Sequence, residues 1–550
     1  MENVQDKKLQ TEVARRRTFA IISHPDAGKT TLTEKLLLYG GAIHLAGAVK
    51  AKSQQRNTTS DWMEIERKRG ISISTSVLRF EYDGIQVNLL DTPGHKDFSE
   101  DTYRTLVAVD AAVMLIDAAK GVEPQTRKLF EVCRMRGLPI FTFFNKLDRP
   151  SRDPLDLIDE LEKVLGIRSA PVTWPIGMGD RFRGVYDRHA NEILIFNRET
   201  GGNAKSKLVP IKVNGIDDPK FLDSLPGDRN DNIELVAELK SHLELLEIAG
   251  DPFDEERVLK GQLSPVFCGS AMNNFGVERF LEYFLKMAPP PQSRSSNAGE
   301  IEPVDPRFSG MFFKIQANMD PQHRDRVAFL RVVSGKFTRS MEARHGRLDQ
   351  VFRLAKSIHF FGQERMTLEE AWPGDIVGLL DTSGDFRIGD TLAEGRRMEF
   401  DGVPRFAPEN FATVGAADPL KRKQLQKGLE QLTEEGVVQL FRQTARQEAY
   451  PILGAVGALQ FEVFEARLKS EYRVDVKLER LPFVRACWLK GDGVDPEEFN
   501  KYADCAYVQD RDGLPVVLFK SEWSVNWAKD KYKAVQFLDA APLARAEEVV

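Results

Sequence analysis

The first half of the chain alternates short apolar runs with amphipathic stretches. Four runs are continuous and bounded by loop signals: residues 18–23 (TFAIIS), 87–91 (VNLLD), 111–118 (AAVMLIDA) and 139–144 (PIFTFF). Such runs are typical of strands buried on both faces of a parallel sheet. Helical patterns separate them, and residues 31–39 are predicted to form a helix. The pattern therefore predicts an α/β domain that binds ligands at the carboxyl ends of its strands.

Composition narrows the class of protein. The length of 550 residues indicates three or four domains, and 42% hydrophobic with 29% charged residues is typical of a soluble globular protein. The hydrophilic start predicts no secretory signal, and no apolar run approaches the ~20 residues that span a bilayer. The four cysteines are far apart, so we expect neither a disulfide framework nor a zinc site, but a reducing cytoplasm. A net charge of −6 argues against coating nucleic acid through bulk charge, though not against local basic faces.

The loop after the first apolar run is predicted to bind phosphates. It ends in Gly28-Lys29-Thr30, and a glycine lets the backbone amides and the helix N-terminus approach an anion. Lys29 is expected to reach the β- and γ-phosphates, and the Thr30 hydroxyl to ligate Mg²⁺. Asp26 either caps the loop or touches a monovalent ion. The predicted contact residues are Ser23, His24, Pro25, Asp26, Ala27, Gly28, Lys29, Thr30 and Thr31.

Two further motifs are predicted to sense the γ-phosphate and its metal. In Asp91-Thr92-Pro93-Gly94-His95, Asp91 is expected to hold Mg²⁺ and Gly94 to offer its amide to the γ-phosphate. His95 is the candidate catalytic residue, orienting the attacking water, and the alternative is a surface histidine beside a turn. In Arg-Gly-Ile-Ser at 69–72, Ser72 is expected to be the second metal ligand, and the alternative is an ordinary turn serine. Ser74 and Thr75 are the alternatives for this ligand.

A fourth motif, Asn145-Lys146-Leu147-Asp148, is predicted to recognise the base. The Asp148 carboxylate can accept hydrogen bonds from N1–H and the exocyclic amine of guanine. Adenine has no donor at N1, and mismatches of this kind are rejected by ~10⁴ or more. The stem of Lys146 can lie along the base. Amides at Ser270 and Ala271, after a further strand-like run, could bind the guanine O6.

These four motifs together resemble the set found in translational GTPases. Within that group, longer stretches resemble the bacterial family of class II release factors, known as peptide chain release factor 3. They are residues 23–31 (SHPDAGKTT), 69–77 (RGISISTSV), 97–106 (DFSEDTYRTL), 171–177 (PVTWPIG) and 313–329 (FKIQANMDPQHRDRVAF). The resemblance runs from about residue 17 to residue 536. Ser23, where a glycine usually stands, is itself part of that family's phosphate loop.

The resemblance implies a multidomain α/β, β-barrel and α+β architecture. A P-loop GTPase domain is expected at 12–291, with an insertion at about 177–261 because that stretch is long for one connection. A translation-factor β-barrel is expected at 303–398, where residues 326–336 (RVAFLRVVSGK) predict a strand ending in a turn. An α+β domain like the third domain of elongation factor G is expected at 400–541. Pro/Ser-rich segments at 289–291 and 293–299 predict a linker between the first two domains.

The resemblance also implies a function in termination. Family members bind GTP and Mg²⁺ and act as monomers on the ribosome, on its RNA and proteins. The GTP form promotes departure of a class I release factor. The family member then hydrolyses GTP and leaves the ribosome in its GDP form. A small intrinsic rate is expected because no arginine obviously enters the site.

Three other functions compete with termination. Translocation, as in elongation factor G, requires two further C-terminal domains for which this chain ends too soon. A binding switch that barely hydrolyses is disfavoured by His95. A metabolic transferase would need a substrate site, and the sequence shows no paired carboxylates or Cys/His arrangement to build one.

Two basic clusters are candidates for ribosome contacts. They are Arg324, Arg326 and Arg331, and the run Lys421-Arg422-Lys423. Charge runs are more often solvated faces than RNA sites, so we expect solvated faces, with contact to RNA or ribosomal protein as the alternative.

Overall fold

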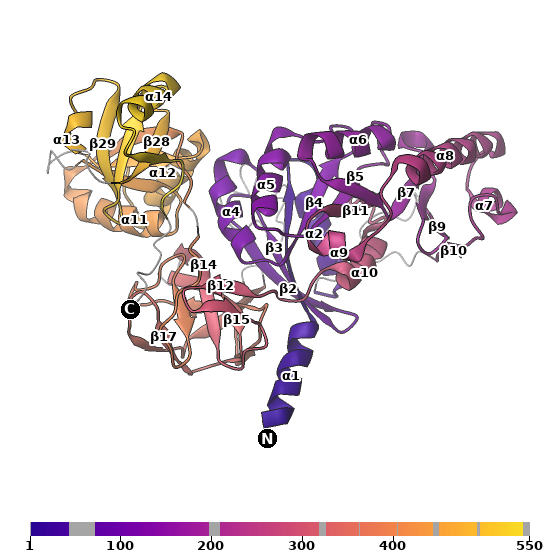
Figure 1. Cartoon of the computed structure of the whole chain (residues 1–550), viewed down its shortest axis with the longest axis horizontal. Helices are drawn as coiled ribbons and strands as arrows, with labels where there is room; N and C mark the ends of the chain where they lie inside the picture. The colour runs from indigo at the N-terminus through magenta and orange to yellow at the C-terminus, as the bar shows by residue number, and fades with distance from the viewer. Residues whose placement is uncertain are drawn as a thin grey trace.

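The computed structural model describes residues 2–42, 72–196, 209–317, 326–361, 364–403, 405–443, 450–491 and 496–542. Figure 1 shows three parts. The nucleotide part, from β1 to α10, lies in the centre and carries a lateral insertion. The β-barrel, from β14 to β23, lies below it, and the α+β third part, from β24 to β31, lies beside both. The α/β, barrel and α+β classes predicted from the sequence are confirmed. Residues 69–71 of the second motif, and Arg324, lie outside the described residues.

A seven-stranded sheet carries the nucleotide part, in the order β2-β3-β1-β4-β5-β11-β6. Each neighbouring pair is parallel except β2–β3, which is antiparallel. The strands are β1 (Arg16–Ser23), β2 (Ser76–Tyr82), β3 (Ile85–Asp91), β4 (Ala111–Asp117), β5 (Ile140–Asn145), β6 (Arg168–Pro171) and β11 (Leu263–Cys268). The four apolar runs coincide with β1, β3, β4 and β5, whereas the edge strand β2 was not predicted.

Helices cover both faces of this sheet. On one face, α4, α5 and α6 contribute Leu106, Leu129 and Leu161 to an apolar core. On the other, α2 and α10 pack through Leu36 and Phe284. The helices are α2 (Lys29–Tyr39), α4 (Ser99–Val107), α5 (Pro124–Met135), α6 (Pro154–Leu165), α9 (Glu255–Leu259) and α10 (Val277–Met287). Two cores of this kind are typical of a doubly wound α/β domain, with ligand loops at the strand ends.

The insertion forms a small domain of its own beyond β6. Its antiparallel sheet has the order β10-β9-β8-β7 and packs against α8 around the buried Trp174. The elements are β7 (Thr173–Ile176), η3 (Gly179–Arg181), β8 (Gly184–Asp187), β9 (Glu192–Ile195), β10 (Ile211–Lys212), α7 (Pro219–Ser224) and α8 (Arg229–Ala249). This sheet begins at Thr173, a few residues before the position where the sequence predicted the insertion.

The barrel is antiparallel and has the strand order β18-β17-β23-β14-β15-β22-β19-β20. Its interior is filled by alternate side chains such as Phe312, Leu330 and Val377. The strands are β14 (Ser309–Ala317), β15 (Arg326–Ser334), β16 (Phe337–Thr338), β17 (Glu342–His345), β18 (Val351–Arg353), β19 (Ser357–Phe361), β20 (Glu364–Thr367), β21 (Glu370–Ala371), β22 (Ile376–Leu380) and β23 (Thr391–Ala393).

The segment before the barrel, predicted as a linker, is a docked hairpin. Strands β12 (Arg294–Ser296) and β13 (Gly299–Ile301) pair with each other. Arg294 donates to the Val109 carbonyl at 2.7 Å and pairs with Asp110 at 3.2 Å. A Pro/Ser-rich composition suggests a spacer, but these ion-pair and backbone contacts fix the segment on the nucleotide part.

The third part has one eight-stranded antiparallel sheet, ordered β27-β24-β26-β25-β29-β30-β28-β31. The pair β25–β29 joins two halves, each with its own helix-covered core. Side chains such as Phe441 and Trp488 on the opposite face of the sheet bring the halves together in one apolar cluster. Its elements are β24 (Asn410–Ala416), η5 (Pro419–Lys421), α11 (Arg422–Glu434), β25 (Gln439–Arg442), β26 (Ile452–Ala455), α12 (Ala458–Tyr472), β27 (Val476–Leu481), β28 (Arg485–Lys490), α13 (Pro496–Phe499), β29 (Cys505–Asp510), β30 (Pro515–Phe519), α14 (Glu522–Lys531) and β31 (Gln536–Leu538).

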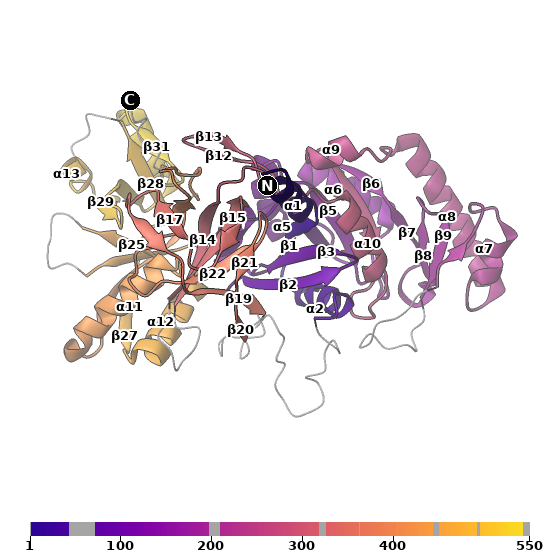
Figure 2. The ribbon, with the colours of Figure 1, turned by 90° about the horizontal axis from the view of Figure 1, so that it is seen from below.

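Buried ion pairs join the nucleotide part to the barrel. Arg331 is 2% exposed and contacts Asp110 at 2.5 Å, and Arg16 contacts Asp375 at 2.9 Å. Burial alone would raise the pKa of Asp375, but Arg79 and Arg16 hold it below its ordinary value. Arg326 is also buried, and pairs with Asp381 and with Glu434 of the third part. The expectation of solvated faces was therefore wrong for Arg326 and Arg331, whose charges hold the parts together. Figure 2 shows the barrel in contact with both neighbours.

The N-terminal helix strengthens this junction. Helix α1 (Glu2–Ala14) runs into β1, and its Leu9 and Val13 pack against Trp372 of the barrel. Lys8 and Lys336 lie 5.4 Å from the centre of the same indole ring, within the range of a cation–π contact. The nucleotide part and the barrel are thus connected by apolar, aromatic and ionic contacts.

The cysteines lie inside the protein as free thiols. All four cysteines are free and buried, and burial raises the pKa of the Cys487 and Cys505 thiols to about 11. These two thiols are therefore protonated at neutral pH.

Among the residues that the structure describes, no helix has the length and apolar character needed to cross a membrane.

Candidate nucleotide site

The phosphate loop connects β1 to α2 and requires a glycine at one position. Gly28 has φ 101°, in the left-handed region, and a Cβ there would lie 2.4 Å from the Asn145 amide nitrogen. Both facts exclude a side chain at this position. Thr30 and Thr31 follow in the first turn of α2, half buried, so their amides belong to the free N–H groups of a helix start. The loop therefore presents backbone donors where an anion is expected.

Lys29 and Asp91 meet at the centre of the site. Lys29 Nζ donates to Asp91 Oδ1 at 2.7 Å, and both side chains are buried. The other oxygen, Asp91 Oδ2, is buried without a hydrogen-bond partner among the described residues. A buried carboxylate oxygen left in this way is costly unless it meets a cation or a donor. The arrangement fits the metal that the sequence predicts at Asp91.

The turn after β3 packs directly on the phosphate loop. The Thr92 hydroxyl donates to the Ile21 carbonyl at 2.7 Å, which fixes the turn to β1. A Cβ on Gly94 would lie 3.6 Å from Pro25 Cα and 3.8 Å from Lys29 Cε. Gly94 is therefore next to the lysine expected at the γ-phosphate, as its predicted role requires.

His95 caps the short helix η2 (Lys96–Phe98). Its Nδ1 accepts a hydrogen bond from the Asp97 backbone N–H at 3.2 Å. In the neutral ring, Nδ1 then carries the lone pair and Nε2 carries the proton. This tautomer presents a donor at Nε2, which suits orienting a water or an oxygen rather than abstracting a proton.

Ser74 and Thr75, the two alternatives for the second metal ligand, are both in contact with other side chains. Lys314 of the barrel donates to the Ser74 hydroxyl, which in turn contacts Gln316 at 3.1 Å. The Thr75 hydroxyl lies 2.7 Å from Asp101 Oδ2. The side chains of these two alternatives are thus held by the barrel and α4. Ser72 as the second metal ligand stays a prediction.

Asn145 joins three loops of the site. Its amide nitrogen donates to the Ala27 carbonyl at 2.8 Å, and its amide oxygen accepts from the Ala271 N–H at 2.8 Å. Lys146 has φ 72°, and its Nζ contacts the Asp26 carbonyl at 2.5 Å and Asp117 Oδ2 at 2.7 Å. The base motif, the phosphate loop and the Ser270–Ala271 turn therefore form one connected unit.

Asp148 is oriented by a residue that the sequence analysis did not single out. Asn273 donates from Nδ2 to Asp148 Oδ2 at 2.9 Å and also contacts the Ser270 hydroxyl at 3.2 Å. Asp148 Oδ1 is buried, and within the described ranges it has no hydrogen-bond partner. The carboxylate thus keeps Oδ1 for one of the two guanine donors, and Oδ2, although held by Asn273, has a second lone pair for the other.

We expect Asn273→Ala to weaken GDP binding by about fivefold, because one hydrogen bond that orients Asp148 is lost at ~1 kcal/mol. Preference for guanine over adenine should persist, since Asp148 itself remains. Equilibrium titration with fluorescent GDP and competing ADP measures both effects. Asn273→Asp is the matched variant: it places a second carboxylate beside Asp148 and should weaken binding further. Equal affinity in all three proteins would contradict the orienting contact.

Three residues of the site were not predicted from the sequence. Asp117, at the end of β4, holds Lys146, and Asn273 holds Asp148. Glu123 Oε1 lies 3.1 Å from His24 Nε2 in the phosphate loop. Asp117 could have been predicted from the sequence, since a carboxylate at the carboxyl end of a parallel strand lies at the edge of the sheet where ligands bind. The other two lie in loops whose contacts only the fold brings together.

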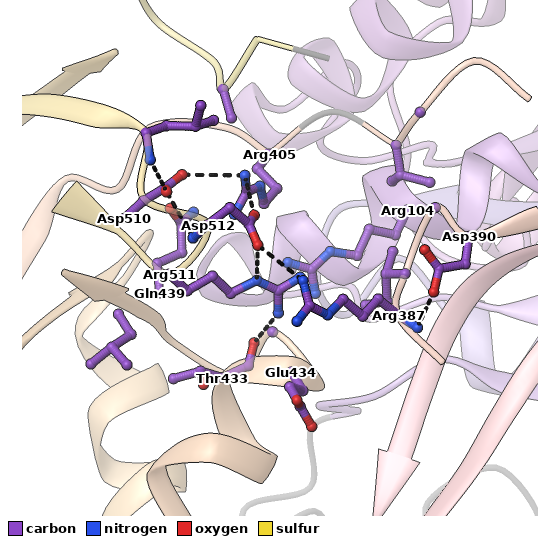
Figure 3. A pocket seen from close by; sticks show the side chains of 18 of the residues that line it. Arg104, Arg387, Asp390, Arg405, Thr433, Glu434, Gln439, Asp510, Arg511 and Asp512 are labelled. Carbon is purple, nitrogen blue, oxygen red and sulfur yellow. Dashed lines mark hydrogen bonds and ion pairs between the residues drawn. The ribbon is translucent and has the colours of Figure 1, made fainter. Parts of the chain in front are cut away.

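A cavity of about 430 Å³ lies at the junction of the three parts (Figure 3). Its lining includes five arginines: Arg104, Arg347, Arg387, Arg405 and Arg511. Arg405 contacts Asp510 at 3.2 Å and Asp512 at 2.8 Å, and Arg387 contacts Asp512 at 3.5 Å. Burial lowers the pKa of Arg511, and the neighbouring guanidinium groups lower it further, against the effect of Asp512. Because carboxylates balance these arginines, the lining forms a contact between parts rather than an anion site.

One group between the start of α6 and helix α8 of the insertion has the composition of a metal site. Asp153, Glu238 and His242 lie close together. However, the buried Trp174 indole donates to His242 Nδ1 at 3.3 Å. The neutral ring then carries its proton on Nε2, 3.7 Å from Asp153 Oδ2, and cannot offer a lone pair there. This group is better described as a hydrogen-bonded contact.

The fold and the site define a translational GTPase. Residues 14–290 match the family described as elongation factor Tu GTP binding domain, and residues 307–395 match elongation factor G domain 2. Residues 400–529 match the class II release factor RF3, C-terminal domain. The chain belongs to the peptide chain release factor 3 family, and it is a guanine-nucleotide-binding GTPase of translation termination.

Curated relatives cover nearly the whole chain. The peptide chain release factor 3 of Symbiobacterium thermophilum is 55% identical over 96% of this chain and 98% of its own length. That of Gloeobacter violaceus is 55% identical over 97% and 99%. A solved crystal structure of a protein from Thermus thermophilus, designated ttk003000868, superposes with a TM-score of 0.67. The match covers 90% of this chain and 72% of the other at 24% identity, which supports the fold alone.

Proposed function

We propose that this protein is a ribosome-dependent GTPase that promotes dissociation of class I release factors after peptide release, with GTP hydrolysed to GDP and phosphate. The observation that carries the proposal is the arrangement of Lys29, Asp91, Gly94 and His95 around one loop, in a chain of the release factor 3 family. We expect it to act in the cytoplasm as a monomer.

The residues that bind the nucleotide are proposed as follows. The phosphate loop from Ser23 to Thr31 holds the phosphates, and Lys29 neutralises charge on the β- and γ-phosphates. Asp148 and Lys146 hold the guanine base. The Ala271 N–H donates to Asn145 Oδ1 in this structure and would have to exchange that partner to bind the guanine O6. Thr30, Ser72 and Asp91 would hold Mg²⁺, which when bound neutralises phosphate charge.

His95 is proposed to orient the attacking water. Its Nε2–H can donate to an oxygen near the γ-phosphate while Nδ1 is held by the Asp97 amide. The side chain is 28% exposed, so a partner can reach it. Contact with the ribosome would then fix the ring and accelerate hydrolysis, as activators do for other GTPases. Loss of the γ-phosphate would free Gly94 and the segment around Ser72, which is the two-state switch of this class.

The test is the dissociation rate of a labelled class I release factor from a post-termination ribosome, with this protein and GTP, with GDP in its place, and without it. We expect clear acceleration with GTP. If dissociation does not accelerate while the ribosome still stimulates hydrolysis, the chemistry holds but the role lies at another step of translation.

A further inference from the structure

Asp97, two residues after His95, is held by the third part of the chain. Its Oδ2 accepts a hydrogen bond from the Leu459 backbone N–H at 2.7 Å. Leu459 lies in the first turn of the 15-residue helix α12, so the carboxylate faces the positive end of the helix dipole. The Asp97 side chain is nearly completely buried, and the interaction is therefore little screened by salt.

Gly457, just before α12, makes this contact possible. Its φ is −136°, which any residue adopts. A Cβ there, however, would lie 1.9 Å from Asp97 Cγ and 2.3 Å from each carboxylate oxygen. The glycine is thus required by the neighbouring carboxylate and not by its own backbone. A methyl group at this position must push α12 and the turn apart.

The same Asp97 contacts the catalytic candidate. Its N–H donates to His95 Nδ1, and its Oδ1 lies 3.4 Å from that nitrogen. One residue therefore contacts the imidazole on one side and α12 on the other. A shift of α12 by about an ångström would move the turn that carries the ring.

Apolar contacts join α12 to both switch segments. Ile73, Phe98 and Val463 form a buried cluster, with Leu459 and Val437 packed against it. Ile73 follows the proposed metal ligand Ser72, and Phe98 follows Asp97. The third part thus contacts, in one cluster, both segments that are proposed to sense the γ-phosphate.

We propose that Asp97 is a positioning residue for His95, and that docking of α12 on Asp97 sets the rate of GTP hydrolysis. The proposal rests on the role proposed for His95. In this arrangement the third part controls the catalytic turn: ribosome-stimulated hydrolysis is fast while Leu459 holds Asp97 and slow when the two separate.

The first test is Gly457→Ala. Ribosome-stimulated single-turnover hydrolysis should slow by ~10-fold to ~10²-fold, because a displacement of about 1 Å at a catalytic group has effects of this size. GTP affinity should change less than about twofold, since the residues that bind the nucleotide are untouched. Ala458→Ser adds one atom at the exposed neighbouring position and is the matched control, expected at the wild-type rate.

A double-mutant cycle separates positioning from simple destabilisation. Asp97→Ala should slow hydrolysis as Gly457→Ala does, and Asp97→Asn, which keeps an acceptor for Leu459, should restore most of the rate. In the Asp97→Ala background the added methyl has room, so Gly457→Ala should cost little more. The proposal is overturned if the double variant loses the product of the rate losses of Asp97→Ala and Gly457→Ala. It is also overturned if Asp97→Asn hydrolyses GTP as slowly as Asp97→Ala. Normal hydrolysis by His95→Ala would instead refute the proposed role of His95.

Discussion

Asp148→Asn should shift nucleotide preference from guanine to xanthine. Asn273 donates to Oδ2 of Asp148, so the carbonyl of an asparagine there would face Asn273 and its amide nitrogen would take the place of Oδ1. That nitrogen donates where the carboxylate accepted, which matches the 2-oxo group of xanthine and opposes the amine of guanine. We expect GTP affinity to fall by ~10² or more, with XTP becoming the preferred ligand.

Competition binding of GTP and XTP to the wild-type and variant proteins measures this shift. Asp148→Ala is the matched control, because it removes the acceptor without supplying a donor. It should lose GTP affinity without gaining XTP affinity. If the Asp148→Asn protein still prefers GTP, residues other than Asp148 recognise the base.

His95→Ala should leave GTP binding intact and slow ribosome-stimulated hydrolysis by ~10² or more. The reason is the tautomer: with Nδ1 held by the Asp97 amide, the ring offers an N–H at Nε2 to the attacking water. Single-turnover hydrolysis on ribosomes, with parallel titration of GTP binding, separates the two effects.

The side chain that replaces His95 tests the tautomer itself. His95→Gln keeps an N–H donor of similar reach, and we expect it to hydrolyse GTP faster than His95→Ala. If His95 acted as a general base, glutamine would be as slow as alanine. If the His95→Ala protein hydrolyses GTP at the wild-type rate, His95 is an ordinary surface histidine and has no part in hydrolysis.

Local patterns in the sequence predicted much of the nucleotide part. The run 111–118 is β4 (Ala111–Asp117), and 139–144 overlaps β5 (Ile140–Asn145), because continuous apolar runs have few alternatives to a buried strand. The motif residues from Ser23 to Asp148 come together because they follow parallel strands. Their individual roles stay predictions.

Features that depend on distant partners could not be predicted in this way. Arg331 belongs to a sequence typical of an exposed basic face, yet it pairs with Asp110 far earlier in the chain. The hairpin at Arg294 has the composition of a spacer and is docked by the same aspartate. Asn273 reaches Asp148 only because β11 lies beside β5. Charge pairs and loop contacts of this kind depend on the fold, and periodicity says nothing of them.

The place of β11 in the sheet also bears on how the protein is made. Strand β11 pairs with both β5 and β6, although β6 and the whole insertion precede it in the chain. A nascent chain must therefore complete the insertion before its central sheet can close, and such long-range pairing is slow. The Ser270–Ala271 turn follows β11, so the base-binding end of the site is synthesised last. A newly made chain should not discriminate guanine until this late strand has emerged and joined its neighbours.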